Sequence, residues 1–279
     1  MQFEYLSQNK AYGGTQYVCS HASASTGTDM TLSVYVPPHR PEERLPVLWY
    51  LSGLTCTHAN VTEKGEYRAA CAEHGIVLVA PDTSPRGADV PDAPDEYDFG
   101  KGAGMYLDAT QDPWSANYRM RTYLEDELPA LIAAEFPVSQ TRQAITGHSM
   151  GGHGALTMAL RNPGRFRSVS AFSPIVAPSQ VPWGEKAFSR YLGEDRTAWR
   201  AYDAVALIED GARLDHLLVD QGTADQFLEE QLKPGLLSMA CAKAGMQPEI
   251  RMWEGYDHSY YFISTFMGEH VAWHAARLR

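Results

Sequence analysis

The pattern of hydrophobic and polar positions divides the chain near residue 45. Before that point, two short runs rich in β-branched and aromatic residues, 15–21 and 31–36, are separated by a Ser/Thr/Gly stretch. Such runs predict strands, and Pro37-Pro38 ends the second because proline cannot donate to a sheet ladder. We therefore predict a pair of antiparallel strands at the start of the fold.

After residue 45, short apolar strands alternate with helices. Ile76–Ala80 is apolar at every position, which indicates a strand of a parallel sheet covered by helices on both faces. The predicted strands are Val47–Leu51, Ile76–Ala80, Gln143–Thr146, Ser168–Phe172, His216–Asp220 and Glu249–Trp253. The predicted helices are Glu66–Glu73, Tyr118–Glu135, Met150–Arg161, Glu229–Lys243 and Tyr260–Arg277. This alternation predicts an α/β fold with a mostly parallel, doubly wound sheet.

Two long stretches, 81–114 and 174–210, lack a clear period, and we expect them to be irregular. The first is rich in glycine, aspartate and aromatic residues, which favours a pocket wall over a flexible linker. No repeat or linker divides the chain. Its 279 residues are close to the size at which one core stops growing. We expect a single domain over residues 1–279.

Charge and composition exclude several classes of partner. The formal charge is 23 − 34 = −11, which repels phosphate backbones and anionic membranes. No segment approaches the ~20 apolar residues of a membrane span, and residues 1–5 show no signal-peptide pattern. The four cysteines, Cys19, Cys56, Cys71 and Cys241, include no CxxC pair, which fits reduced thiols. We expect a cytoplasmic protein that binds neither nucleic acid nor membranes.

The motif Gly147-His148-Ser149-Met150-Gly151 matches G-x-S-x-G. Five residues with three fixed are weak evidence alone, but a predicted strand precedes this serine and a predicted helix follows it. That context is a nucleophile elbow of the α/β-hydrolase fold, in which the glycines permit a sharp turn and the helix dipole favours negative charge. A simple helix N-cap is the alternative role of Ser149.

A serine nucleophile needs a base, which a third group orients. In this fold the order is serine, acid, histidine. His258 follows the last predicted strand and precedes the last helix, at the carboxyl edge of the sheet where such sites lie. His148 and His153 lie too close to Ser149 in sequence to act as its base. His258 is the predicted base.

Asp225 is the predicted acid because it lies on the loop beyond the strand that ends at Asp220. Asp220 lies within that strand and Asp257 is adjacent to the histidine, so neither is well placed to hold the ring. A cap for the following helix is the alternative role of Asp225. The backbone N–H groups of Leu54 and Met150 are the predicted oxyanion hole, because one donor follows the nucleophile and the other follows an early strand.

We expect no metal and no cofactor. His270 and His274 have an i, i+4 spacing, but the glutamate of an HExxH motif is missing. The glycines at 100, 102 and 104 follow no strand, so they do not form a dinucleotide-binding fingerprint.

With these residues assembled, nearly the whole chain resembles the S-formylglutathione hydrolases of the esterase D family. The most specific blocks are Leu51–Cys56, Ala80–Gly87, Asp98–Gly104, Gly147–Gly154, Asp220–Asp225 and Gly255–Phe262. The resemblance implies hydrolysis of the thioester S-formylglutathione to glutathione and formate, a step of formaldehyde detoxification. It also implies activity on short-chain esters, a cytoplasmic location, frequent homodimers and the same triad of Ser149, Asp225 and His258.

The resemblance further places a cysteine, here Cys56, in the pocket as a non-essential residue. The sequence departs from the family pattern at His58-Ala59 and at Lys101, which affects the pocket for the leaving group. Because glutathione is anionic, a basic residue must offset the charge of the chain. Lys101 and Arg86 are the candidates, and either is equally well explained as a surface charge.

Two other functions fit parts of the pattern. A general short-chain carboxylesterase would use the same triad on another substrate. A binding protein that keeps the fold without catalysis is disfavoured by the intact Ser/Asp/His set.

Overall fold

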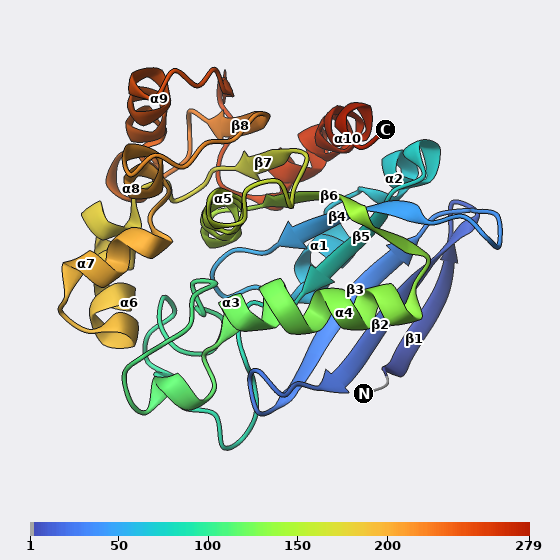
Figure 1. Cartoon of the computed structure of the whole chain (residues 1–279), viewed down its shortest axis with the longest axis horizontal. Coiled ribbons are helices and arrows are strands. Elements are labelled where there is room, and N and C mark those ends of the chain that lie inside the picture. Colours follow the sequence, from blue (N-terminus) through green and yellow to red (C-terminus); the bar gives the residue numbers. More distant parts are fainter. Residues whose placement is uncertain (1–2) are drawn as a thin grey trace.

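A computed structural model describes residues 3–279. Met1 and Gln2, part of the stretch inspected for a signal peptide, lie outside the described residues. The centre of the molecule is a nine-stranded sheet with the order β1-β2-β3-β5-β4-β6-β7-β8-β9 (Figure 1). Its strands are β1 Glu4–Ala11, β2 Gly14–Ala22, β3 Asp29–Val36, β4 Leu45–Leu51, β5 Val77–Pro81, β6 Val138–Gly147, β7 Val169–Phe172, β8 Leu217–Gly222 and β9 Glu249–Trp253.

The sheet is antiparallel at its N-terminal end and parallel over the rest. β1, β2 and β3 pair antiparallel, as do β3 and β5, whereas β5, β4, β6, β7, β8 and β9 run parallel. The α/β-hydrolase architecture predicted from the sequence is therefore confirmed. The register pairs Leu51 with Gly147, so β4 and β6 end level with each other.

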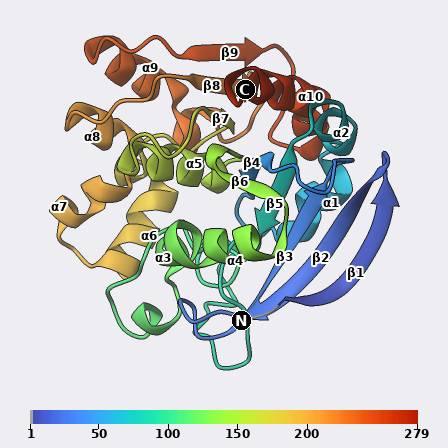
Figure 2. The same ribbon diagram turned by 45° about the vertical axis from the view of Figure 1, so that its right-hand side comes forward.

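Helices cover both faces of the sheet (Figure 2). On one face, Leu48 and Tyr50 of β4 pack with α1 His58–Lys64, α2 Arg68–His74 and α10 Tyr260–Arg277. On the other face, Trp49 and Leu51 pack with a larger core. The helices that contribute to that core are α3 Met120–Thr122, α4 Leu128–Glu135, α5 Met150–Arg161, α6 Pro182–Leu192, α7 Arg196–Trp199, α8 Ala204–Glu209 and α9 Pro234–Lys243. No helix among residues 3–279 has both the length and the apolar character needed to cross a bilayer.

The structure corrects several predicted elements. The stretch 174–210 is not irregular, because it folds into α6, α7 and α8. The predicted helix 118–135 contains a π-helical turn, Tyr123–Glu127, and the predicted helix 229–243 is interrupted at Lys233, whose φ is 48°. The strand β1 and the helix α1 were not predicted. β1 is mostly polar and exposed, and α1 has only seven residues, with a capping box between Thr57 and Asn60.

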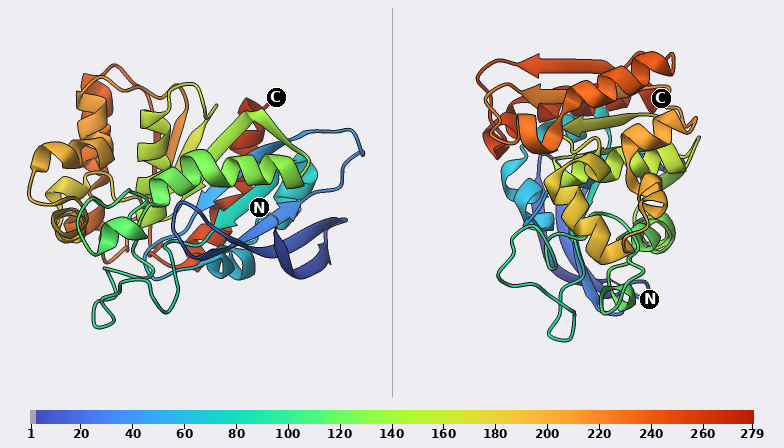
Figure 3. Two further views of the ribbon diagram at one scale, coloured as in Figure 1. Left: turned by 60° about the horizontal axis from the view of Figure 1, so that its bottom comes forward. Right: turned by 90° about the vertical axis from the view of Figure 1, so that its left-hand side faces the viewer.

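The segment 82–113 is irregular as predicted, and it is held against α6. Figure 3 shows it extending beyond the sheet as a set of loops. The ring of Phe99 stacks on that of Tyr191 with a centroid distance of 4.4 Å. Lys186 Nζ lies 2.8 Å from Asp98 Oδ1, and the Tyr191 hydroxyl accepts a hydrogen bond from Gly100 N–H at 3.1 Å. These contacts fix a wall beside the carboxyl edge of the sheet.

Candidate active site

Ser149, the predicted nucleophile, lies at the sharp turn between β6 and α5. Its backbone has φ 57° and ψ −117°, a strained conformation that persists only where the surrounding structure enforces it. The neighbouring strands supply that constraint. Ser149 N–H donates to Phe172 O of β7 at 2.9 Å, and His148 N–H donates to Leu51 O of β4 at 3.0 Å. The turn is thereby fixed on both sides.

Two glycines are required because backbone segments approach closely at this turn. A Cβ atom at Gly147 would lie 2.2 Å from Gly151 O, and one at Gly151 would lie 1.9 Å from Leu51 O. Both distances are far below van der Waals contact, and the opposing atoms belong to the backbone, which cannot move aside. The glycine positions of the motif thus place α5 directly against the end of β4.

Asp225 and His258 meet at the neighbouring strand ends. His258 Nδ1 lies 2.6 Å from Asp225 Oδ2. The two loops are joined along their backbones, because Thr223 N–H donates to Trp253 O and Ala224 N–H donates to Tyr256 O, both at 2.9 Å. The loops after β8 and β9 therefore present the pair as one unit.

The Asp225 carboxylate is buried, and burial alone would raise its pKa. Hydrogen bonds from His258, from the Phe227 N–H at 2.9 Å and from the Gln221 amide at 3.1 Å outweigh burial and hold the pKa of Asp225 below its ordinary value. The side chain is thus an ionised acceptor that fixes the imidazole with Nδ1 protonated. This geometry leaves Nε2 of His258 free to face the pocket.

The two other candidate acids are engaged elsewhere. Both carboxylate oxygens of Asp220 accept from Arg251 at 2.6 Å, and one lies 3.2 Å from His270 Nε2. Asp257 accepts from the backbone N–H and the hydroxyl of Ser259. Of the three candidate acids, Asp225 is the one whose carboxylate binds the ring of the predicted base.

The predicted oxyanion amides lie on adjacent strand ends. Leu54 follows β4, and Met150 is the first residue of α5. Within residues 3–279, neither N–H has a hydrogen-bond acceptor, although Met150 is fully buried. Free amides at such a position are suited to receive an anionic oxygen.

A pocket of about 220 Å³ brings the predicted residues together. Ser149, His258, Leu54 and Cys56 line it, and burial raises the pKa of the Cys56 thiol. Its other lining residues are Gly53, Thr55, Tyr97, His148, Trp183 and Phe227. The pocket is small and largely apolar, with no lining carboxylate, lysine or arginine among the described residues.

Sequence reasoning missed four members of this lining. Tyr97 and Trp183 come from the segment 82–113 and from α6, and the indole Nε1–H donates to the tyrosine hydroxyl at 3.0 Å. Phe227 packs edge-on against His258 with a centroid distance of 5.0 Å. The fourth, His148, faces the ring of His258 at 4.5 Å. The positions of His148, next to Ser149, and of Phe227, two residues after Asp225, could have indicated proximity, whereas tertiary packing alone brings Tyr97 and Trp183 here.

The two basic candidates for binding an anionic leaving group are absent from this lining. Arg86 Nε lies 3.6 Å from Asp82, and Lys101 Nζ lies 3.8 Å from Asp92. The expectation that one of them offsets charge in the pocket is therefore not supported by the geometry.

His270 and His274 lie buried on the inner face of α10, as the helix-face interpretation predicts. The two rings share the hydroxyl of Ser170, which lies 2.8 Å from a ring nitrogen of each. Ser168 lies 2.7 Å from the other nitrogen of His274. The described residues contain no group of three or more histidine, cysteine, aspartate or glutamate side chains arranged to hold a metal.

Known proteins of similar sequence and structure identify the family of this chain. A family model described as a putative esterase matches residues 23–275. An S-formylglutathione hydrolase from Agrobacterium tumefaciens shares 58% identity, covers 100% of both chains and has a TM-score of 0.98. An S-formylglutathione hydrolase from Staphylococcus aureus shares 16% identity over 99% of this chain and 100% of its own, with a TM-score of 0.72. A fluorophosphonate-binding serine hydrolase from the same organism shares 16% identity over 94% and 98%, with a TM-score of 0.75.

The fold and the site define a serine hydrolase of the α/β-hydrolase class. The match over residues 23–275, together with 58% identity to a full-length relative, goes further: the chain belongs to the esterase family. The family resemblance predicted from the sequence blocks is confirmed. The two relatives at 16% identity show the shared fold alone.

Proposed function

We propose that this protein hydrolyses S-formylglutathione to glutathione and formate, with Ser149, His258 and Asp225 as the catalytic triad. One observation carries the chemistry: the 2.6 Å contact between His258 and Asp225 beside a pocket that Ser149 lines. The 58% identical relative that is named an S-formylglutathione hydrolase supports the choice of substrate. A pocket of about 220 Å³ has room for the formyl group and also for larger short acyl groups.

The proposed reaction proceeds through a formyl-enzyme. Nε2 of His258 takes the proton of Ser149 Oγ as that oxygen bonds to the formyl carbon. The tetrahedral oxyanion accepts hydrogen bonds from the N–H groups of Leu54 and Met150. The C–S bond then breaks, and the protonated His258 gives its proton to the departing sulfur.

Water completes the cycle. The water oxygen attacks the formyl carbon while His258 takes a proton from the water. His258 then gives that proton to Ser149 Oγ as formate leaves. Asp225 stabilises the imidazolium in both halves without taking the proton. Cys56 is proposed as a pocket residue only, because its raised pKa keeps the thiol protonated near neutral pH.

A short-chain carboxylesterase is the second candidate, and one observation favours it. Among the described residues, the pocket lining contains no lysine or arginine for the carboxylates of glutathione. Arg86 and Lys101 pair with Asp82 and Asp92 instead. In that case the same triad would act on a neutral ester.

Steady-state kcat/KM for S-formylglutathione and for p-nitrophenyl acetate separates the two candidates. We expect a strong preference for the thioester, and Ser149→Ala should lower kcat by about 10⁴-fold or more on both substrates. Ser173→Ala is the matched control, because its buried hydroxyl has no partner among the described residues. A preference for the acetyl ester would support the carboxylesterase, and an active Ser149→Ala enzyme would refute the triad.

We also propose a single domain over residues 1–279, a cytoplasmic location and a homodimer. The domain proposal is supported by the two cores, which lie on opposite faces of one sheet. All four cysteines are free, which fits a reducing compartment. The homodimer is carried over from the family resemblance.

A further inference from the structure

The turn that presents the Leu54 amide contains a strained residue. Cys56 N–H donates to Gly53 O at 3.3 Å, which closes a tight turn over Gly53–Cys56. Inside it, Thr55 has φ 65°. A β-branched residue is a clear outlier in this left-handed region because its side chain crowds the backbone. Such a conformation persists only where neighbouring groups impose it.

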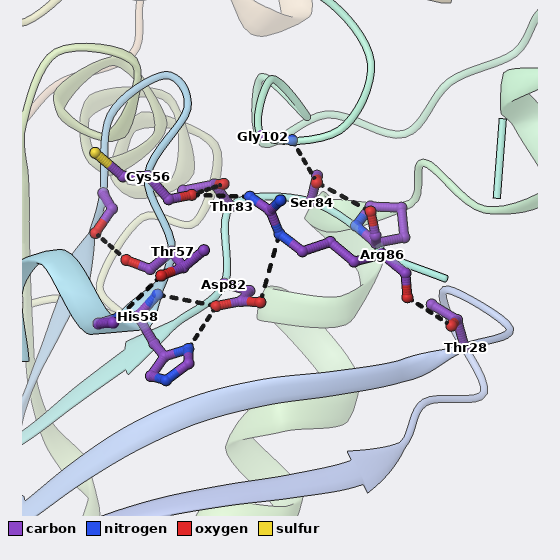
Figure 4. A network of polar contacts seen from close by, with 12 residues as sticks. Thr28, Cys56, Thr57, His58, Asp82, Thr83, Ser84, Arg86 and Gly102 are labelled. Carbon is purple, nitrogen blue, oxygen red and sulfur yellow. Dashed lines mark hydrogen bonds and ion pairs between the residues drawn. The ribbon is translucent and has the colours of Figure 1, made fainter. Parts of the chain in front are cut away.

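Hydrogen bonds on both sides of Thr55 impose it here. On one side, Thr55 N–H donates to Gly102 O at 2.9 Å. On the other side, Cys56 O accepts from Thr83 Oγ1 at 2.5 Å and from Arg86 Nη2 at 3.1 Å (Figure 4). The N–H of the strained residue and the carbonyl of the residue after it are therefore both anchored to the segment that follows β5.

The anchor fits closely against the turn. Gly102 N–H donates to Ser84 Oγ at 2.8 Å, which fixes the carbonyl that binds Thr55. A Cβ atom at Gly102 would lie 3.1 Å from Thr55 Cα and 3.4 Å from Arg86 Nη2. A glycine at this position lets the loop, the turn and the guanidinium share one small space.

Asp82 holds the guanidinium from the opposite side. Its carboxylate is buried at the end of β5, 3.6 Å from Arg86 Nε, and it also accepts from the backbone N–H of His58 at 2.9 Å. His58 Nδ1 lies 2.6 Å from the same oxygen. Thr28 Oγ1 donates to Arg86 O at 3.0 Å (Figure 4). Asp82 thus connects the first residue of α1 to the side chain that binds Cys56 O.

We propose that Arg86, oriented by Asp82, is a positioning residue that holds the Gly53–Cys56 turn in its strained form and so aims the Leu54 N–H at the developing oxyanion. The inference rests on the proposed acyl-transfer chemistry of this pocket. Without the guanidinium, the turn can relax toward negative φ at Thr55, and the Leu54 amide turns away from the reacting carbonyl. Arg86, one of two candidates for binding the anionic leaving group, acts in this proposal on the backbone of the site instead.

A double-mutant cycle between Arg86→Gln and Thr55→Gly tests this proposal with p-nitrophenyl acetate. Arg86→Gln should lower kcat by about 10- to 100-fold with little change in KM, because a misplaced oxyanion donor weakens the transition state more than the ground state. Glycine adopts φ 65° without strain. In the Thr55→Gly background the same Arg86→Gln change should therefore cost less than about threefold.

Arg121→Gln is the matched control. Arg121 is 30% exposed against 35% for Arg86, and it also pairs with an aspartate, Asp108, at 3.2 Å. It should lower the melting temperature without the loss in kcat. An equal cost of Arg86→Gln in both backgrounds, or a fall in melting temperature with an unchanged kcat, would overturn the proposal. If Arg86→Gln does not fold, Thr83→Val removes the other donor to Cys56 O, and Thr83→Ser should retain activity.

The rate at which a fluorophosphonate labels Ser149 is a second readout, because the phosphoryl oxygen occupies the same oxyanion position. It should fall in parallel with kcat for Arg86→Gln. Both readouts are independent of whether S-formylglutathione is the substrate. If S-formylglutathione proves a poor substrate, the effect of Arg86→Gln on p-nitrophenyl acetate can still be measured. If Arg86→Gln leaves kcat unchanged, a preference for the thioester would still stand.

Discussion

Asp220 and Asp225 lie five residues apart, and each contacts an imidazole, yet their surroundings differ. Asp220 is buried within β8 against Arg251 and His270, whereas Asp225 lies on the loop after β8 against His258. Hydrogen bonds outweigh burial in both cases and lower the pKa of each carboxyl. Each therefore stabilises the fold above a pH of about 3.9, and that contribution is lost as the pH falls through the lowered native pKa.

We expect Asp225→Asn to lower kcat by about 10³- to 10⁴-fold with a modest change in melting temperature, because the neutral amide no longer fixes the His258 tautomer or stabilises its cation. Asp220→Asn is the control. It should lower the melting temperature and leave kcat of the folded enzyme within about threefold of wild type. Steady-state kinetics and thermal unfolding of both variants make the comparison. The opposite pattern would assign the acid to Asp220.

The roles of the three triad residues could be predicted from the sequence, because their order along the chain and their positions just after strands identify them. Ser149, Asp225 and His258 follow strands in the order that this fold requires. The structure places Ser149 and His258 in one pocket, with Asp225 in contact with His258 behind it. The contacts of Arg86 could not be predicted. They join the ends of β4 and β5 with the loop at Gly102, and no local pattern reports which backbone carbonyl a guanidinium meets.

At the scale of elements, the contact between α5 and β4 is the tightest constraint on the site. Gly151→Ala would place a methyl group 1.9 Å from Leu51 O. We expect it to destabilise the protein by about 3 kcal/mol or more, since neither backbone can yield, and to displace the Met150 amide. Urea unfolding and kcat measure the two effects.

Gly268→Ala in α10 is the matched helical control. Its added Cβ would find its nearest atom at 4.0 Å, in Ala70. Alanine is favoured over glycine within a helix by about 0.5–1 kcal/mol, so this variant should be slightly more stable and fully active. A Gly151→Ala enzyme as stable as Gly268→Ala would show that the close approach at the turn is dispensable.

Element prediction succeeded where burial shapes the sequence. Most central strands are apolar on both faces, and α5 follows a recognisable motif, so both were predicted close to their observed ends. The strand β6 is the exception: it was predicted over 143–146 but begins at Val138, because its first half is partly exposed. Prediction failed where short elements depend on tertiary contacts. The helices of 174–210 pack on α5 and on the segment 82–113, and β1 is a polar edge strand without a buried face.

At the scale of the whole molecule, five histidines are buried, and burial lowers the pKa of each. They are His21, His148, His153, His270 and His274. For His153 the pKa falls to about 4. In the unfolded chain an imidazole binds its proton near pH 6.5, so the unfolded state binds more protons below that pH. Stability must therefore fall as the medium is acidified.

We expect the free energy of unfolding to be nearly constant between about pH 7 and pH 8 and to decline steadily below pH 6.5. His153 alone accounts for about 3 kcal/mol between pH 6.5 and 4, at 1.36 kcal/mol per pKa unit. Urea unfolding at intervals from pH 7.5 to 4.5 measures the decline. His153→Gln should reduce the slope of the free energy of unfolding against pH, because the unfolded state of the variant takes up about one proton fewer. A free energy that stays flat down to pH 5 would contradict the assignment of neutral buried imidazoles.

The fold class and the doubly wound sheet could be predicted at this scale because alternation of strands and helices is a global property of the pattern. The shape of the pocket could not, since Tyr97, Trp183 and Phe227 reach it from three separate segments.

That separation has a consequence for how such a protein diversifies. The nucleophile, the base and the oxyanion amides lie at strand ends or on the loops that directly follow them, whereas Tyr97 and Trp183 come from two longer connections, the segment 82–113 and α6. Mutation can reshape those connections while the strand ends stay in place. Substitutions in those connections should therefore change the range of substrates that the pocket admits while the catalytic groups stay in place.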